Sequence, residues 1–291
     1  MEPPIRIFKQ PALRNPSLII GWADAGLVGI NTIDYLIEKL DAEELGGIDS
    51  HDFSLLPDVV IKKSVIKDIE YTNHTFYYWE NNKDMEDLLL LGSRPPDMNH
   101  YKFANLILDV AELFHVKRIF TVGGLYTDVS HTEIPRISAV INDSDLKDYL
   151  KPYDVDLSMN YHGQSSINGL IIGIAKRRNI DGISLWGNVP SYIGEIPNPQ
   201  ICEAILKVLT KILNIDIDFD DIEAEANYTN KQINELVAYL RQQDPSFNKH
   251  IDKLEKGIII ETSDEERQKF FEEIDLFLKK QDDHHENNST Q

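Results

Sequence analysis

A glycine-rich segment, GWADAGLVG at residues 21–29, directly follows an apolar run. Glycine-rich turns between a strand and a helix often hold phosphate, because free N–H groups of the helix point at the ligand. A P-loop needs lysine and serine or threonine after its last glycine, whereas Leu27 follows Gly26 here. In the dinucleotide fingerprint, Gly26 and Gly29 fit the last two glycines, but Asp24 replaces the first and would repel the pyrophosphate. The segment is therefore not predicted to bind phosphate.

Asp24 itself admits two interpretations. Placed just before a helix, its carboxylate can accept hydrogen bonds from the free N–H groups of the first turn, a cap worth ~1 kcal/mol. Gly26 and Gly29 would then let this turn approach a strand or a neighbouring chain closely. Alternatively, Asp24 at the carboxyl end of a strand faces a ligand cleft of the kind found in open α/β sheets. The cap is the favoured interpretation.

The segment YHGQSSING around Ser165 begins like a nucleophile elbow, G-x-S-x-G, which exposes a serine on a tight turn. Ile167, however, stands where the second glycine is needed. The proximity of His162 in sequence carries little weight, because catalytic partners usually come from distant segments. We expect instead that Ser165 or Ser166 caps a helix whose first turn contains Asn168.

For a metal ion, the segment DVSHTE at residues 128–133 offers two carboxylates and an imidazole. Its spacing matches no zinc motif such as H-E-x-x-H, and a solvated loop often has this composition. His284 and His285 form only a pair near the end of the chain, and Cys202 is expected to be a small buried apolar residue. The sequence therefore indicates no metal site, no cofactor and no catalytic set.

The composition excludes several classes of partner. The 291 residues carry a net charge of −20, which repels nucleic acid and anionic membranes, and no basic stripe offsets it. A single cysteine excludes a disulfide framework. The first residues, MEPPIRIFKQP, lack the apolar core of a signal peptide, and no stretch approaches the ~20 apolar residues of a membrane span. A cytoplasmic protein is expected.

The elements that must position these residues alternate between strands and helices. Strands are predicted at 17–21, 58–66, 75–79, 86–92, 118–122, 136–141 and 182–186, and helices at 25–40, 101–114, 166–178 and 198–213. The strand at 118–122 is expected to end at Gly123 and Gly124. Apolar strands that alternate with amphipathic helices predict an α/β fold with a mostly parallel sheet covered on both faces.

Near residue 214 the composition becomes acidic, and the rest of the chain has helical periodicity. We predict an α/β domain at 1–215, a helical acidic extension at 216–280 and a polar, disordered tail at 281–291. The extension carries two apolar helical faces, which must pack on the body, on each other or on a neighbouring subunit. These faces are Ile233, Leu236, Val237 and Leu240, and Phe270, Phe271, Ile274, Phe277 and Leu278.

Several segments, in this order, resemble the proteasome assembly chaperone 2 family, above all its archaeal and bacterial branch. They are GWADAGLVG, GSRPPD at 92–97, VGGL at 122–125 and SSINGLIIGIAKRRNIDGISLWGNVPSYIGEIPNPQ at 165–200. The resemblance covers about the first 215 residues and implies a three-layer α/β/α body like that of nucleoside phosphorylase and hydrolase folds. It also implies homo-oligomers and, in some members, a role as chaperone or scaffold for proteasome subunits. Members that dock on the proteasome end in a hydrophobic residue, tyrosine and one more residue, whereas this sequence ends in NSTQ.

Two functions follow from these observations. The favoured one is a non-enzymatic, protein-binding module that forms a homo-oligomer larger than a dimer, with proteasome-type subunits as partners. The alternative is a hydrolase or transferase that acts on a small polar ligand at the carboxyl ends of the strands. Its candidate cleft is lined by residues near strand ends and helix starts: Asp24, Gly26, Gly124, Glu133, Ser165 and Asn168.

The failed phosphate motifs generate a direct prediction. ATP, GTP and NAD should leave the melting temperature unchanged, because neither a P-loop lysine nor an intact dinucleotide fingerprint is present. A ligand at 100 times its dissociation constant stabilises a folded protein by about 2.7 kcal/mol, which a thermal melt detects easily. A clear upward shift with any of the three nucleotides contradicts the prediction.

Overall fold

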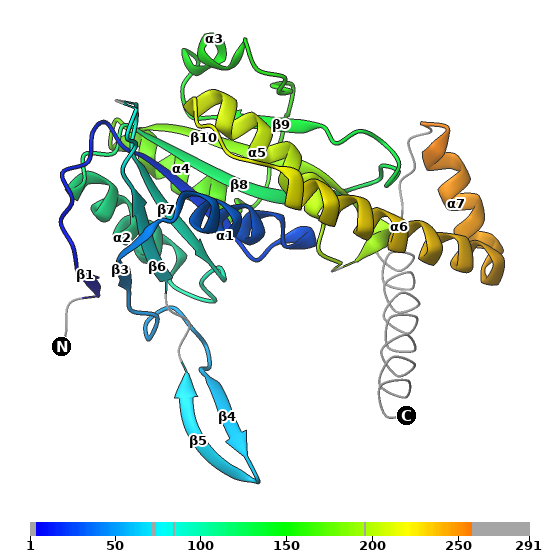
Figure 1. The fold of residues 1–291 in the computed structure, drawn as a ribbon, viewed down its shortest axis with the longest axis horizontal. Helices are drawn as coiled ribbons and strands as arrows, with labels where there is room; N and C mark the ends of the chain where they lie inside the picture. The colour runs from blue at the N-terminus through cyan, green and yellow to red at the C-terminus, as the bar shows by residue number, and fades with distance from the viewer. Residues whose placement is uncertain (1–3, 71–73, 84, 195, 258–291) are drawn as a thin grey trace.

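The computed structural model describes residues 4–70, 74–83, 85–194 and 196–257. They form an α/β body with a two-stranded arm and a helical extension (Figure 1). The strands of the main sheet are β1 (Ile5–Ile7), β2 (Ser17–Trp22), β3 (Glu43–Ile48), β6 (His74–Trp79), β7 (Leu88–Ser93), β8 (Arg118–Thr127), β9 (Ile137–Ile141) and β10 (Asp181–Pro190). The helices are α1 (Val28–Leu40), α2 (His100–Leu113), α3 (Leu146–Leu150), α4 (Ile167–Arg177), α5 (Pro199–Leu213), α6 (Asp220–Gln243) and α7 (Pro245–Glu255). Short 3₁₀ turns, η1 (Ala25–Leu27) and η2 (Ser191–Ile193), precede α1 and follow β10.

The main sheet has the strand order β1-β3-β6-β7-β2-β8-β10-β9. Its four central strands, β7, β2, β8 and β10, run parallel, and the joins to β6 and β9 at the flanks are antiparallel. The pairs β1–β3 and β3–β6 are antiparallel as well. The α/β class and the parallel centre confirm the prediction, whereas the flanks make the sheet mixed. Parallel neighbours need long crossovers, and helices α1 and α2 lie in the connections that follow β2 and β7.

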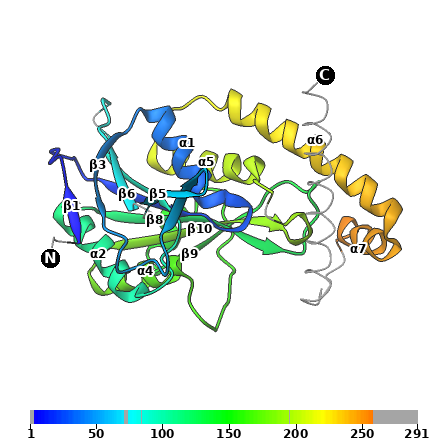
Figure 2. The ribbon, with the colours of Figure 1, turned by 90° about the horizontal axis from the view of Figure 1, so that it is seen from below.

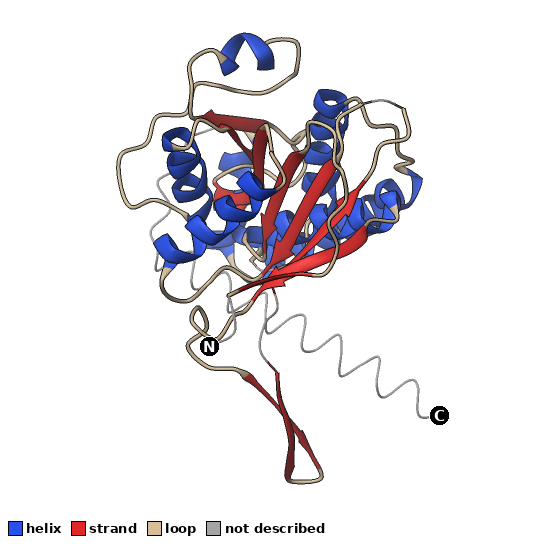
Figure 3. Cartoon of the chain, turned by 90° about the vertical axis from the view of Figure 1, so that its left-hand side faces the viewer, coloured by secondary structure: helices blue, strands red, loops and turns tan. Residues whose placement is uncertain are grey.

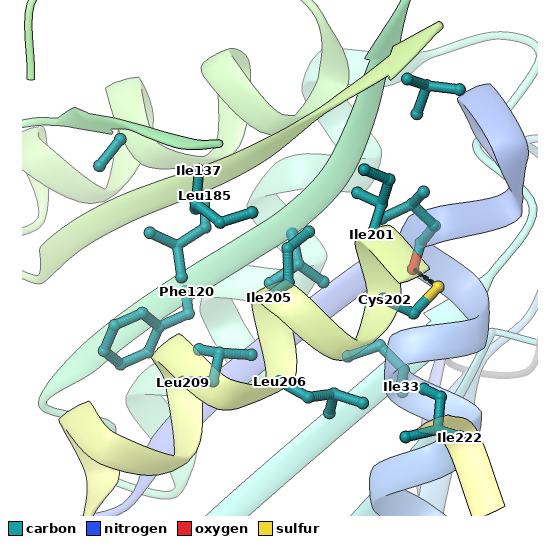
Figure 4. Packing of buried hydrophobic residues seen from close by; sticks show 14 of the residues in the cluster. Ile33, Phe120, Ile137, Leu185, Ile201, Cys202, Ile205, Leu206, Leu209 and Ile222 are labelled. Atoms are coloured by element: carbon teal, nitrogen blue, oxygen red, sulfur yellow. Dashed lines mark hydrogen bonds between the residues drawn. The ribbon is translucent and has the colours of Figure 1, made fainter. Parts of the chain in front are cut away.

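Helices pack on both faces of this sheet (Figure 2). On one face, α1 and α5 bury Ile33, Leu36 and Ile205 against strand residues such as Phe120 and Leu185. Figure 4 shows this packing around α5, where the Cys202 thiol points at the carbonyl oxygen of Val28, 3.6 Å away. On the other face, α2 and α4 form a second buried cluster with inward residues of β2 and β7.

Two predicted strands differ from the structure. The run at 58–66 belongs to an antiparallel hairpin, β4 (Asp58–Lys62) and β5 (Val65–Glu70), outside the main sheet. A turn at Lys63 and Ser64, both at positive φ, separates the two strands. Strand β8 does not end at Gly123 and Gly124 but continues to Thr127, because β10 pairs with it along its whole length. A long-range partner thus overrides the local turn signal of two glycines.

Helix α6 shares the core of the body. Its predicted apolar face is buried: Ile233, Leu236, Val237 and Leu240 are all at most 5% exposed. They belong to the same cluster as α5 and α1, and Phe247 and Ile251 of α7 join it. The second predicted face, at 270–278, lies outside the described residues. Within the described part of the chain, no helix is both long and apolar enough to cross a membrane.

Helix α1 begins in direct contact with strands β2 and β8. Two glycine-to-alanine substitutions, one at this contact and one away from it, test how closely the helix packs. A Cβ on Gly29 would lie 2.7 Å from backbone atoms of Trp22 and 2.9 Å from the carbonyl oxygen of Val122. Gly29→Ala should therefore lower the free energy of unfolding by about 1–3 kcal/mol or more, because the backbone must shift. The control Gly173→Ala lies in helix α4 with open space around it, and it should raise stability by about 0.5–1 kcal/mol. Urea unfolding measures both, and a Gly29→Ala protein as stable as wild type refutes this packing.

Candidate functional site

The candidate site lies where strand β2 ends and helix α1 begins. Asp24 follows the carboxyl end of β2, between strands β7 and β8, at the edge where open α/β sheets bind ligands. The turn after Asp24 has a left-handed backbone conformation: Gly26 and Leu27 have φ values of 61° and 53°. A left-handed leucine costs about 1–2 kcal/mol, so surrounding contacts must hold it. One of these is the hydrogen bond from the Asn198 N–H to the Gly26 carbonyl, at 2.9 Å.

The Asp24 carboxylate joins two segments that are 100 residues apart. One oxygen accepts the N–H of Gly29, at 2.9 Å, in the first turn of α1. The other accepts the N–H of Gly124, at 2.8 Å, in strand β8. The first bond confirms the predicted capping of the helix, although Leu27 occupies the N-cap position itself. The second bond to a distant strand has no local sequence signal.

Burial changes the chemistry of this carboxyl group. Removal of water raises the pKa of Asp24 to about 7, and the two backbone hydrogen bonds oppose this shift only in part. No cation appears among the causes of its shift. The group therefore exchanges a proton near neutral pH, although both of its oxygens already accept backbone hydrogen bonds.

Asn168 reaches the same site from helix α4. Its Oδ1 accepts the indole N–H of Trp22 at 2.7 Å, and both side chains are 2% exposed. Its amide nitrogen faces Gly123, where a Cβ would clash with the Asp24 carboxylate. The structure thus brings Asp24, Gly124 and Asn168 together around strand β8. The absence of a side chain at Gly123 leaves the space that the carboxylate occupies.

Glu133 and Ser165, the other residues of the predicted cleft, lie elsewhere. Glu133 accepts the N–H of Ser130 at 3.3 Å and lines a small hollow with His131 and Asn198. Ser165 lines a different hollow beside strand β10. Gly26 lies two residues after Asp24, and a Cβ on it would lie 3.2 Å from the Cβ of Asn198 and 3.3 Å from a methyl carbon of Val189. The hollow that Glu133 shares with His131 does not contain Ser165, and the hollow that Ser165 lines contains none of the other predicted residues.

His131, a possible metal ligand from its segment, makes other contacts. Its Nδ1 lies against the Tyr192 hydroxyl, and its Nε2 is 3.0 Å from Oδ1 of Asn234 in helix α6. Burial lowers the pKa of this imidazole and favours its neutral form. Nowhere in the described part of the chain do three or more histidine, cysteine, aspartate or glutamate side chains gather as metal ligands. His131 therefore links the body to the extension.

Two smaller predictions hold. Ser166 is the N-cap of helix α4, and its hydroxyl accepts the N–H of Gly169 at 3.2 Å. Cys202 is buried, and desolvation raises the pKa of its thiol to about 12. It therefore behaves as a small apolar residue and not as a nucleophile.

The sequence did not predict the hollow that contains Ser165, which we name the uncharged groove. It has a volume of about 640 Å³ and lies beside the N-terminal end of α4, over strands β8, β10 and β9. Its lining contains no charged residue: Leu125, Val140, Met159, Asn160, Tyr161, Gln164, Ser165, Ser166, Gly169, Ile172, Ser184 and Trp186. Leu125, Met159 and Tyr161 are 42, 39 and 74% exposed. Only the folded sheet brings these separate segments together.

Known proteins share the sequence pattern and the fold of this chain. The profile of the PAC2 family matches residues 18–237. An uncharacterized protein from Methanocaldococcus jannaschii is 26% identical over 216 residues, 74% of this chain and 80% of that protein. The structure is similar to Pyrococcus furiosus PbaB, an archaeal proteasome activator, with a TM-score of 0.69, 28% identity and coverage of 80% of this chain and 97% of that one.

A bacterial structure shares the fold as well. A proteasome-assembly chaperone homologue from Mycobacterium tuberculosis superposes with a TM-score of 0.69 and 20% identity, and the match covers 81% of this chain and 99% of that one. The matched part of this chain includes Asp24 and its partners Gly29 and Gly124, because the family profile spans all three.

The Asp24 geometry generates a prediction about pH. The folded state holds the Asp24 proton more tightly than the unfolded state does, since its pKa rises from 3.8 to about 7. This contribution to stability is therefore complete below about pH 3.8 and is lost as the pH rises through about 7. Asp24→Asn cannot titrate, and its amide NH₂ must face one of the two N–H donors, an unsatisfied contact that costs about 1–3 kcal/mol. The near-neutral effect that a simple cap predicts for asparagine is thus not expected.

Thermal melts of both proteins between pH 5 and pH 8 test this expectation. Asp24→Asn should melt well below wild type at pH 5, and the gap should narrow by pH 8. Asp41→Asn, at the exposed end of the same helix, is the control and should follow the wild-type curve. A gap between wild type and Asp24→Asn that is constant across the range contradicts the raised pKa.

Proposed function

Since the chain belongs to the PAC2 family, we propose that it is a non-enzymatic, self-associating chaperone or scaffold for a protein complex of the proteasome type. The observation that carries this proposal is the 28% identity to an archaeal proteasome activator over 80% of the chain. The family profile, at residues 18–237, includes most of the body, the Asp24 site and part of helix α6. The assembly-chaperone homologue from Mycobacterium tuberculosis is consistent with the same kind of partner.

The chemistry of the Asp24 site also supports a role without catalysis. Phosphate-binding α/β proteins present the free N–H groups at a helix N-terminus to their ligand. Here the protein's own carboxylate takes the Gly29 N–H, and its second oxygen takes the Gly124 N–H. These two N–H groups are therefore not free to hold an anionic ligand. A hydrolase or transferase is not favoured, since two of its candidate residues, Glu133 and Ser165, line separate hollows, and our proposal requires neither a cofactor nor a metal.

The remaining parts of the proposal concern the class of partner, the cellular location and the oligomeric state. A net charge of −20 favours protein partners over nucleic acid or anionic membranes. We propose that the chain acts in the cytoplasm as a homo-oligomer larger than a dimer. We also propose a three-layer α/β/α body that is comparable with phosphorylase and hydrolase folds in architecture alone, because fold does not determine function.

Co-expression with the proteasome α- and β-type subunits of the same organism tests the proposed function. The full chain should co-elute with α-type subunits in size-exclusion chromatography, and the fraction of subunits in assembled particles should rise. The control is an unrelated monomeric protein of similar size and charge, which separates specific binding from the effect of acidic surface. Separate elution together with an assembly yield equal to the control refutes the proposal.

A further inference from the structure

The hairpin of β4 and β5, residues 58–70, is an arm that extends away from the body (Figures 1 and 3). The segment that leads into the arm, which we call its base, is anchored to the body: Phe53 is fully buried, and its ring centroid lies 5.0 Å from that of Phe103. The N–H of Leu55 also donates to the Asp97 carboxylate at 3.0 Å. Beyond this base, the arm forms its own two-stranded sheet. A lone hairpin is at best marginally stable in water, so this arm needs a further contact.

The register of the arm places four of its six apolar residues on one face. Residues directly opposite in an antiparallel pair share a face, and successive residues alternate between faces. The pairs Val59–Ile69 and Ile61–Ile66 therefore lie on the same side, with exposures of 47–64%. A shift in register after Val60 leaves Lys67 as the extra residue and keeps Ile66 on this side. The opposite face carries the pairs Asp58–Glu70, Val60–Asp68 and Lys62–Val65.

The polarity of the arm differs from that of the whole chain. Its three lysines balance its three carboxylates, whereas the chain carries a net charge of −20. Two copies of such an acidic protein repel one another over most of their surfaces. At the neutral arm and the uncharged groove, this repulsion is reduced. No residue of the arm lines the groove of its own chain.

From these observations we propose that the apolar face of the arm docks in the uncharged groove of a second copy of this chain. Val59, Ile61, Ile66 and Ile69 would cover the exposed Leu125, Met159 and Tyr161. The inference rests on the self-association that is part of the proposed function, and it specifies the two surfaces that make the contact between subunits. Each subunit gives its arm to one neighbour and its groove to another, a head-to-tail contact that generates a ring when the rotation closes.

The area of the arm favours the groove over a second arm. A five-residue strand spans about 17 Å, so one face of a two-stranded ribbon covers only about 200 Å². A stable interface needs about 800 Å² per partner. Two arms packed face to face fall far short of this value. An arm seated in a groove is contacted on its edges and tip as well, and every subunit in a ring makes the contact twice.

Disulfide cross-linking tests the contact directly, because the single native cysteine, Cys202, is buried. Ile66→Cys and Met159→Cys are made as separate full-length proteins, mixed and oxidised. The mixture should give a cross-linked dimer, and the double variant should give a ladder of higher species. Tyr228→Cys on exposed helix α6 replaces Met159→Cys as the control and should give only background with Ile66→Cys. A strong dimer from Ile66→Cys alone indicates arm-to-arm packing and overturns the proposal.

A matched pair of charge substitutions gives a second test. Ile61→Asp lies on the apolar face and Val65→Asp on the other face; both positions are exposed, and each substitution adds one negative charge. In light scattering, Ile61→Asp should raise the dissociation constant of the assembly at least tenfold, and Val65→Asp should change it far less. Equal effects of the two contradict the assigned face. A monomeric wild type refutes self-association itself, whereas an oligomer without the Ile66–Met159 cross-link overturns only the docking of the arm.

Discussion

The contact between the start of helix α1 and strands β2 and β8 is the constraint on which the body depends. Gly29 lies so close to Trp22 and Val122 that any side chain would collide with their backbones. This proximity places the first turn of the helix within reach of Asp24, whose carboxylate then joins it to Gly124. The same dense packing removes water from the carboxylate and raises its pKa. The close contact of Gly29 with strands β2 and β8 thus accounts for both the hydrogen bonds of Asp24 and its raised pKa.

The arrangement at Asp24 also bears on ligand binding. The carboxyl edge of the parallel strands and a helix N-terminus, where phosphate binds in other α/β proteins, are both present, but the Asp24 carboxylate accepts the N–H groups of Gly29 and Gly124 there. The surfaces that we propose for recognition lie elsewhere, on the arm and in the uncharged groove. The arm has an apolar face and no net charge, and the groove has no charged residue, so burial of their apolar side chains is favourable and repulsion between acidic copies is reduced there. Asp24 therefore joins helix α1 to strand β8, and in our proposal exposed strands and loops provide the surfaces for binding.

Much of the body could be predicted from the sequence, because the signals are local. The apolar run at β2, the helical period of α1 and the buried face of α6 each lie within a few turns of chain. A serine cap of helix α4, at Ser165 or Ser166, and the burial of Cys202 follow equally from residue type and position, and the structure selects Ser166 as the cap. Glu43 and Glu44 at the start of β3 conceal that strand, since its exposed end has no apolar pattern. The run at 58–66 shows β-propensity but not which partner it pairs with.

The sequence alone determined the α/β class, the family resemblance, the missing phosphate ligands and the capping role of Asp24, since each depends on residues close together in the chain. The tertiary structure decided the second hydrogen bond of Asp24 and its raised pKa, because Gly124 and the desolvating side chains come from distant segments. It also separated Glu133 from Ser165. The apolar face of the arm depends on a one-residue shift between two strands. Such a register is set by pairing across strands, and a slip of one residue would move Ile66 to the opposite face.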